Sequence, residues 1–311
     1  MSASLSGVPA IVEASPGNVV TLPGSGLTAG PNASVVLKQQ GSVRAEWSQV
    51  PDPFWVDTVL ASTFTGTAVS FTVPDGAVSG PLVITADDLS TVTLSLRVAS
   101  QYILAADYLG EGTDTSDLAP AGQPLYTDGG ELDVVLRRAS AYIDTWLGYA
   151  VRMQPRFETH AWRKSRRTYP FCFPVRSVDN FLVRISNFQQ ATISPNDIVI
   201  NQDQRYIEIL SYAVASYALL GAIQNLGLIA NFVELNYTAG FSMLEMPPEI
   251  RQACAMIATE LLIYRRLNRL GLAGLGSAKQ GQQAFDRRSE PFQVPQPALE
   301  LLRPFTQWRA G

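Results

Sequence analysis

The strongest constraint on the fold is an amphipathic stretch from Glu131 to Tyr149, with the sequence ELDVVLRRASAYIDTWLGY. Its apolar residues recur at the i, i+3, i+4, i+7 spacing that places side chains on one face of an α-helix. Asp128 and Glu131 fit a capping box at its start, and Gly148 fits the left-handed residue that often ends a helix. We therefore predict a helix whose apolar face needs a partner. That face comprises Leu132, Val135, Leu136, Ala139, Tyr142, Ile143, Trp146 and Leu147.

A second strong helix is predicted to start at Pro247 and Pro248, because proline suits the first turn of a helix. Arg265, Arg266 and Arg269 fall in its last turns, where cations interact favourably with the helix dipole. The following segment is rich in Gly, Gln and Pro, so we expect an extended tail with one short helix, ordered mainly by a partner. The apolar stripe of the second helix comprises Ile250, Ala253, Cys254, Ile257, Leu261 and Tyr264.

The first hundred residues have a different pattern, in which short β-branched runs alternate with Gly, Pro and Asn. This pattern is typical of a β-sandwich, and no helix is predicted there. In the segment TVTLSLRV, strict alternation places the four apolar side chains on one face. The predicted strands are Val19 to Leu22, Ser34 to Leu37, Val69 to Val73, Leu82 to Thr85 and Val92 to Val98.

Further strands are predicted between the two strong helices, with a turn at residues 201–204. They are Phe171 to Val175, Asn180 to Ile185, Ile193 to Ile200, Tyr206 to Leu210 and the alternating segment around Val233, Leu235 and Tyr237.

Length and composition predict two ordinary domains, since the chain has 311 residues of which 46% are hydrophobic. We place the boundary near Ser100. The segment 101–149 has two basic and eight acidic residues, whereas Ala150 to Arg184 has eight basic and two acidic ones. The basic charge is densest at Arg163, Lys164, Arg166 and Arg167.

The composition gives little support to catalysis or metal binding. Cys172 and Cys254 are too few for a disulfide framework and have no metal-site spacing, so we expect reduced core thiols. His160 is the single histidine, and any Ser-His-Asp or Cys-His scheme would have to use it. We expect no catalytic residues, no metal and no cofactor. The first residues lack the basic region and long apolar core of a signal peptide, so we expect no export.

The run from Ile209 to Val233 has 25 residues and no charge, which leaves two interpretations open. Roughly 20 apolar residues can span a bilayer. Ser211, Ser216 and Gln224 interrupt the run, however, which favours a hairpin or helix buried in the fold or against another subunit.

Two segments of the first hundred residues carry a family resemblance: SPGNVVTLPGSGL and SFTVPDGAVSGPLVIT. They resemble the IPT/TIG branch of immunoglobulin-like domains, in which a Pro-Gly turn precedes a Thr-Leu-x-Gly strand and a Val-Pro corner precedes a Ser-Gly turn. The resemblance covers about ninety residues and implies a fold more than a function.

The order of features after Ser100 resembles the head-to-tail adaptor (connector) family of tailed bacteriophages. The segments that carry the resemblance are YILAADYLG, LDVVLRRASAYIDTWLG, FPVRSVDNFLV, VELNYTAGF and MPPEIRQACAMIATELLIYRR. The chain departs from the family in the apolar stretch 212–231, which replaces a usually short connection, and in the additional N-terminal domain.

The resemblance implies a multidomain α+β protein with three parts. Residues 1–99 would form an immunoglobulin-like β-sandwich, residues 100–274 a helical-bundle adaptor domain with a β-hairpin, and residues 275–311 an extended tail with a short helix. It also implies a non-enzymatic structural virion protein. About twelve copies would form a ring below the portal, in the neck between head and tail, after assembly in the host cytoplasm.

The expected partners are the portal protein, a tail or nozzle protein, and double-stranded DNA that passes without sequence-specific contact. The N-terminal domain could face capsid or tail fibres. Arg163, Lys164, Arg166 and Arg167 are the candidates for a DNA-facing rim, although the sequence favours the alternative that they meet the acidic 101–149 segment of a neighbour or face solvent. The expected portal-binding residues are Arg265, Arg266, Arg269, Leu299, Leu301, Leu302, Phe305 and Trp308.

Two other function classes are open. An adhesive or carbohydrate-binding protein would use the sandwich, with Trp47, Phe54 and Trp55 as stacking faces, although aromatic residues in a sandwich usually belong to its core. An enzyme would need a constellation of carboxylates that the sequence does not show.

Overall fold

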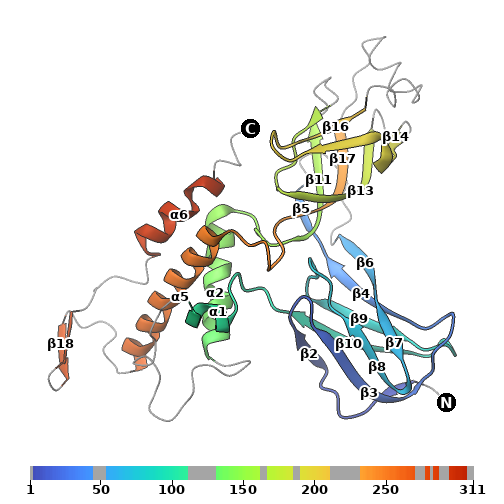
Figure 1. The fold of residues 1–311 in the computed structure, drawn as a ribbon, viewed down its shortest axis with the longest axis horizontal. Coiled ribbons are helices and arrows are strands. Elements are labelled where there is room, and N and C mark those ends of the chain that lie inside the picture. Colours follow the sequence, from blue (N-terminus) through green and yellow to red (C-terminus); the bar gives the residue numbers. More distant parts are fainter. Residues whose placement is uncertain are drawn as a thin grey trace, which may run out of the picture. The chain divides into compact units, whose positions relative to one another are not determined.

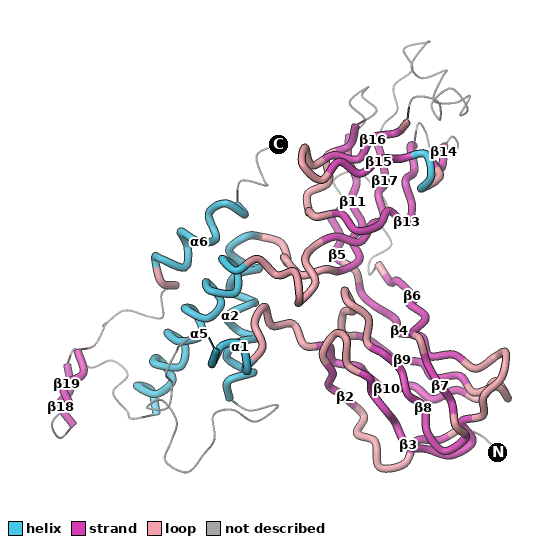
Figure 2. The backbone as a smooth tube through the Cα atoms, in the orientation of Figure 1, coloured by secondary structure: helices cyan, strands magenta, loops and turns pink. Residues whose placement is uncertain are grey.

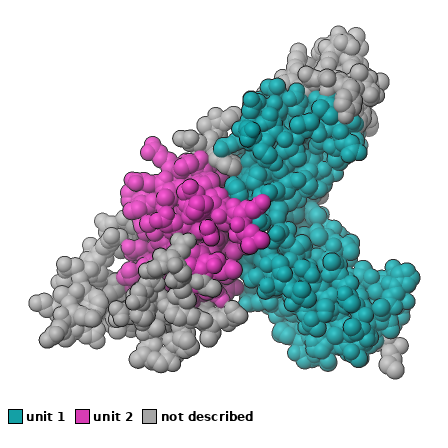
Figure 3. Space-filling model, viewed as in Figure 1, with its two compact units in different colours: residues 1–99, 151–242, 311 teal, residues 100–150, 243–310 magenta. Residues whose placement is uncertain are grey.

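The computed structural model describes residues 3–44, 54–110, 131–161, 167–184, 190–210, 232–269, 277–280, 283–286 and 294–306. The fold is α+β, and the chain divides into two compact units, coloured separately in Figure 3. We call residues 1–99 with 151–242 the β unit, and residues 100–150 with 243–310 the helical unit. The division begins at Ser100, where the boundary was expected, but it joins residues 151–242 to the N-terminal part. The predicted adaptor domain at 100–274 is therefore split between the two units.

Residues 3–40 and 54–98 form a sandwich of two sheets (Figure 1). Its strands are antiparallel apart from β10 and β2, which pair in parallel. The first sheet has the order β1 (Ser4–Leu5), β3 (Val19–Leu27), β8 (Gly66–Thr72), β7 (Ser62–Phe64). The second has the order β2 (Ile11–Ala14), β10 (Thr91–Val98), β9 (Gly80–Thr85), β4 (Ser34–Gln40), β6 (Trp55–Leu60).

The sandwich core confirms the period-two reading of the sequence. All five predicted strands are present as β3, β4, β8, β9 and β10. On β10, Leu94, Leu96 and Val98 are buried while the residues between them are exposed. Across the described residues 3–44 and 54–99 there is no helix.

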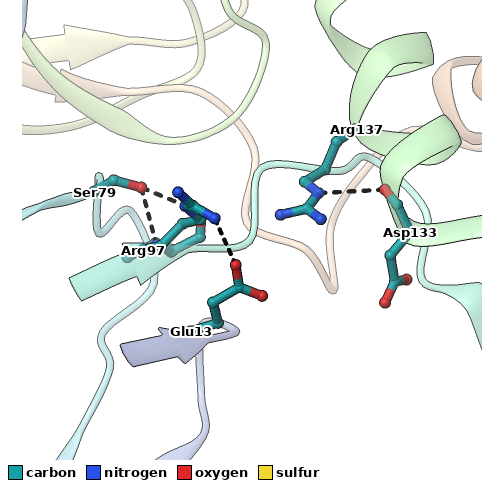
Figure 4. Close-up of polar contacts among 6 residues, drawn as sticks. Glu13, Ser79, Arg97, Asp133 and Arg137 are labelled. Atoms are coloured by element: carbon teal, nitrogen blue, oxygen red, sulfur yellow. Dashed lines mark hydrogen bonds and ion pairs between the residues drawn. The ribbon is translucent and has the colours of Figure 1, made fainter. Parts of the chain in front are cut away.

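Within the sandwich, the strands that the sequence did not reveal lie at sheet edges. On the edge strand β6, Trp55 and Val59 point to solvent with exposed fractions of 47% and 71%, so the strand has little apolar patterning. The edge strand β2 is held to β10 by an ion pair between Glu13 and Arg97, whose atoms lie 2.7 Å apart (Figure 4).

The β unit contains two further sheets, of five and three strands. One has the order β14 (Gln190–Ile193), β13 (Val175–Arg184), β17 (Phe232–Ala239), β11 (Gln154–Ala161), β5 (Ser42–Arg44). The other has the order β12 (Arg167–Thr168), β16 (Tyr206–Ile209), β15 (Ile198–Asn201). The turn predicted at 201–204 is present at 202–205, and the alternation of β17 is confirmed.

Two strand predictions here were wrong. Residues 171–174 form bends, and β13 begins only at Val175. The predicted strand Ile193 to Ile200 is broken by a 3-10 turn, η2 (Pro195–Asp197), because the Ser194 side chain caps it by accepting from the Asn196 amide.

The helical unit contains α1 (Ala105–Gly110), α2 (Glu131–Leu147), α5 (Pro248–Arg269) and α6 (Gln296–Thr306), shown in cyan in Figure 2. A hairpin of β18 (Ser277–Gln280) and β19 (Gln283–Asp286) precedes α6. Both predicted helices are confirmed. Gly148 ends α2 with φ of 74°, and its amide donates a hydrogen bond to the Asp144 carbonyl at 2.7 Å. Asp128 lies outside the described residues.

The helices α2 and α5 meet through small side chains, which let their backbones approach closely. Ala139 and Ser140 of α2 are buried, as are Ala253 and Cys254 of α5. The Ser140 hydroxyl lies 3.4 Å from the Cys254 sulfur and also accepts from the Tyr102 amide at 2.9 Å. The predicted apolar face of α2 is therefore buried, apart from two residues. Tyr142 and Trp146 are 42% and 38% exposed, which corrects their assignment to the core.

The C-terminal segment differs from the extended tail that was expected. Helix α6 packs on α5 and α2 of the same chain and buries Ala298 and Leu302 completely. The Tyr149 hydroxyl donates to the Phe305 carbonyl at 3.1 Å. This helix is ordered by its own chain because its apolar stripe packs against α5 and α2.

The uncharged run at 209–233 falls almost entirely on residues 211–231, outside the described part. Among the helices that the described residues form, none combines the length and apolarity that a membrane crossing requires.

Replacement of Gly240 by alanine should destabilise the β unit strongly. Its φ of +117° is unfavourable for other residues, and an added Cβ would lie 2.4 Å from the Arg152 carbonyl oxygen. We expect Gly240→Ala to lower the free energy of unfolding by about 2–4 kcal/mol. Gly66→Ala is the control, since Gly66 has φ of +83° but no atom within 4 Å of the added Cβ. Equal losses in urea denaturation would contradict the steric account.

Candidate functional site

The β unit contains a buried polar cluster on one face of β11. Alternation along this strand places Arg156, Glu158 and His160 on the same side. The neighbouring strand β17 places Tyr237 opposite Arg156. Arg156, Glu158 and Tyr237 are at most 3% exposed. We call Glu158 with its hydrogen-bonding partners the Glu158 cluster. Sequence analysis missed it, although the alternating charges of QPRFETHA were a signal.

Three groups converge on the Glu158 carboxylate. Its Oε2 accepts from the Phe171 amide at 3.0 Å and lies 3.0 Å from Nε2 of His160. Its Oε1 accepts from the Tyr237 hydroxyl. Burial, and then the charge of Glu158, raises the pKa of Tyr237 well above its usual range, so the phenol keeps the proton that it donates. The cluster therefore holds the buried Glu158 carboxylate by hydrogen bonds.

The chemistry of this cluster does not fit nucleophilic catalysis. A reactive cysteine needs a lowered pKa, whereas burial raises the pKa of Cys172 to about 11. His160 is held between Glu158 and the ring of Phe171, with ring centroids 5.0 Å apart. Within the described part of the chain, no three His, Cys, Asp or Glu residues lie close enough together to hold a metal ion.

The predicted DNA-facing residues are only partly placed. Arg163, Lys164 and Arg166 lie outside the described residues. Arg167 begins β12, where its Nε lies 3.3 Å from a carboxylate oxygen of Glu208 and its guanidinium stacks over Tyr206 at 4.5 Å. The Glu208 carboxylate raises the pKa of Arg167 further. The charge of Arg167 is thus balanced within the chain.

The predicted portal-binding residues have mixed environments. Arg265, Arg266 and Arg269 lie in the last turns of α5, and the Arg265 side chain is partly buried. Leu302 is fully buried against the chain's own helices, so it is not available to a partner. Trp308 lies outside the described residues. Leu299, Leu301 and Phe305 are partly buried on α6.

The exposed aromatic residues of the helical unit form a stripe on α2. Arg138, Tyr142 and Trp146 follow at four-residue spacing and are all exposed. In the sandwich, the candidate glycan-stacking residues are divided. Phe54 packs on Phe157 with ring centroids 5.6 Å apart, Trp55 is exposed, and Trp47 lies outside the described residues.

Comparison with known proteins gives no family. No family model and no curated protein matches the chain. Among solved structures, the chain aligns with one from the virion of a native gene transfer agent particle at 19% identity and a TM-score of 0.35, over 66% of this chain and 89% of that one. A second is SGBP-B of the Bacteroides ovatus mixed-linkage glucan utilisation locus, in complex with a mixed-linkage heptasaccharide, at 12% identity and a TM-score of 0.18, over 74% of this chain and 49% of that one. Likenesses this weak assign no function to the chain.

Replacement of Glu158 by leucine should strongly destabilise the β unit, because it leaves the Phe171 amide and the Tyr237 hydroxyl buried without their acceptor. We expect a loss of roughly 2–4 kcal/mol in the free energy of unfolding. Glu13→Leu is the matched control, since it breaks an exposed ion pair worth at most about 1 kcal/mol. Similar denaturant midpoints for the two variants would show that the Glu158 cluster is not stabilising.

The two thiols should be unreactive in the folded protein. Burial raises the pKa of Cys254 to about 12 and that of Cys172 to about 11, so neither forms the reactive thiolate at pH 8. An aromatic disulfide reagent should therefore modify almost no thiol natively and both in guanidinium. Because the pKa of each thiol is higher in the folded protein than in the unfolded one, the folded state binds these protons more tightly. The contribution of the protonated thiols to stability is therefore complete below about pH 9 and is lost as pH rises towards 11. Rapid native labelling at pH 8 would contradict the burial.

Proposed function

We propose that this chain is a structural protein of a tailed-bacteriophage-like particle. In this proposal it acts as a head-to-tail adaptor, with about twelve copies in a ring below the portal, in the neck of the virion. It carries out no catalysis and needs no cofactor. Its partners are the portal protein and a tail or nozzle protein, and the N-terminal sandwich, as an immunoglobulin-like domain, faces capsid or tail fibres.

The observation that carries this proposal is the exposed stripe on α2. The sequence resemblance assigns α2 and α5 to the adaptor family, and both helices form as expected. Tyr142 and Trp146 continue the apolar face of α2 but are exposed in the single chain. Exposed aromatic side chains at a contiguous patch commonly mark a protein interface. A neighbouring copy in a closed ring would cover them, since a cyclic interface uses two different surfaces of each copy.

The partly buried residues Arg265, Leu299, Leu301 and Phe305, at the end of α5 and on α6, remain the candidate portal contacts. The pairing of Arg167 with Glu208 favours weak contact with DNA. A channel that releases the genome should not hold phosphates tightly, and a balanced cation attracts them less.

A second candidate function is carbohydrate or surface adhesion by the sandwich. Trp55 is 47% exposed on the edge strand β6, with Asp57 exposed on the same face. An aromatic face beside polar groups suits stacking on a sugar ring. A protein that acts in this way need not be present at about twelve copies per particle.

The decisive measurement is the copy number in DNA-filled particles, determined by quantitative mass spectrometry. The adaptor proposal predicts about twelve copies per particle, and loss of tail attachment when the gene is disrupted. Absence from particles, or hundreds of copies, would contradict the proposal and direct attention to glycan binding by the sandwich.

The double variant Tyr142→Ser with Trp146→Ser should fold normally but fail to join the ring. Tyr142 and Trp146 are 42% and 38% exposed, so each loses only part of its buried area and the free energy of unfolding should fall by about 1–3 kcal/mol. Incorporation into particles should fall at least tenfold. Val59→Ser is the matched control, since Val59 is 71% exposed but lies on the sandwich. Unchanged incorporation of the double variant would exclude this stripe as the ring interface.

A further inference from the structure

Strand β5 links two sheets of the β unit in an unusual way. The strands on either side of it in the sequence, β4 and β6, pair with each other in the sandwich. Strand β5 instead pairs in parallel with β11, at the outer edge of the other sheet (Figure 1). In this register Val43 lies opposite Phe157 and Arg44 opposite Glu158. The sandwich thus contributes an edge strand to the sheet that holds the Glu158 cluster.

The chain leaves the sandwich ladder at Gly41. The Gly41 amide still donates to the Phe54 carbonyl at 3.0 Å, and β5 starts at the next residue. A Cβ at Gly41 would lie 2.6 Å from the Phe54 ring and 3.1 Å from the Pro155 carbonyl oxygen. The close approach of the Gly41 backbone to Phe54 and Pro155 therefore requires glycine.

The attachment of β5 is small. It is three residues long, and each of its side chains is exposed, with Val43 at 39%. Besides the parallel ladder, Arg44 stacks over the Phe171 ring at 3.4 Å, and Phe54 packs on Phe157. Because β5 is short and none of its side chains is fully buried, its separation from β11 requires little free energy.

The edge of β11, by contrast, must be covered. Phe157 and Glu158 are only 6% and 2% exposed, and the backbone beside them would otherwise present unpaired groups to solvent. Any copy of the chain carries the strand that fits this edge. The hydrogen bonds and ring contacts are the same whether β5 comes from the same copy or from its neighbour, so exchange costs little contact energy.

We propose that β5 is exchanged between neighbouring copies in the assembled ring, where β5 of one copy adds to β11 of the next. This inference rests on the proposed function, because only a ring holds neighbouring copies at high effective concentration. Exchange couples the sandwich of each copy to the Glu158 cluster of its neighbour. It also adds a second link between neighbouring subunits, besides the contact proposed at Tyr142 and Trp146.

The test uses photo-crosslinking in particles. The photoreactive residue p-benzoylphenylalanine replaces Val43, whose side chain is exposed opposite Phe157. After irradiation, denaturing electrophoresis separates dimers from monomers, and mass spectrometry maps the linked peptides. The same replacement at Val59, on β6, is the control. Copy number is measured on the same particles.

Exchange predicts covalent dimers in which position 43 is linked to residues 154–161, severalfold above the Val59 control. Links to residues 154–161 found only within monomers would overturn exchange, and so would the absence of such links. In both cases a normal copy number would leave the adaptor proposal standing. If the chain is absent from particles, the proposed function itself fails, and the two results are distinguishable.

Discussion

The helical unit depends on the close contact between α2 and α5. Ser140 and Cys254, whose side chains lie 3.4 Å apart, are 114 residues apart in the sequence. Their small size lets the helices approach, and Ser140 also accepts from the Tyr102 amide, which fixes the segment before α1. Helix α6 then packs against both α5 and α2. Through this contact, the segments at 100–150 and 243–310 form one unit although residues 151–242 are inserted between them.

The β unit is organised around a different constraint, the burial of the Glu158 charge. A carboxylate removed from water is stable only when donors and cations surround it. Here the donors come from β11, from β17 and from the bends before β13, so these segments must fold together. Strand β5 then covers the open edge of β11. The sandwich is consequently built into the second sheet, and is more than a separate domain added to the N-terminus.

Much of the secondary structure could be predicted because it is written in local periodicity. The alternation of TVTLSLRV gave β10, and the 3.6-residue pattern gave α2, with Gly148 at its end. The failures have physical causes. Edge strands such as β6 bury little, so Trp55 and Val59 left no apolar pattern. The predicted strand Ile193 to Ile200 is interrupted because Ser194 caps the 3-10 turn that begins at Pro195, and strand propensity does not include this side-chain hydrogen bond.

The sequence by itself determined the helices α2 and α5 and the central strands of the sandwich, because these depend on periodicity among neighbours within a few residues. Tertiary structure alone decided which distant segments pair. It placed β5 on β11, docked α6 on α5 and left Tyr142 and Trp146 exposed. It also balanced Arg167 with Glu208 and gathered the Glu158 cluster. These outcomes depend on long-range packing, which local patterns do not encode.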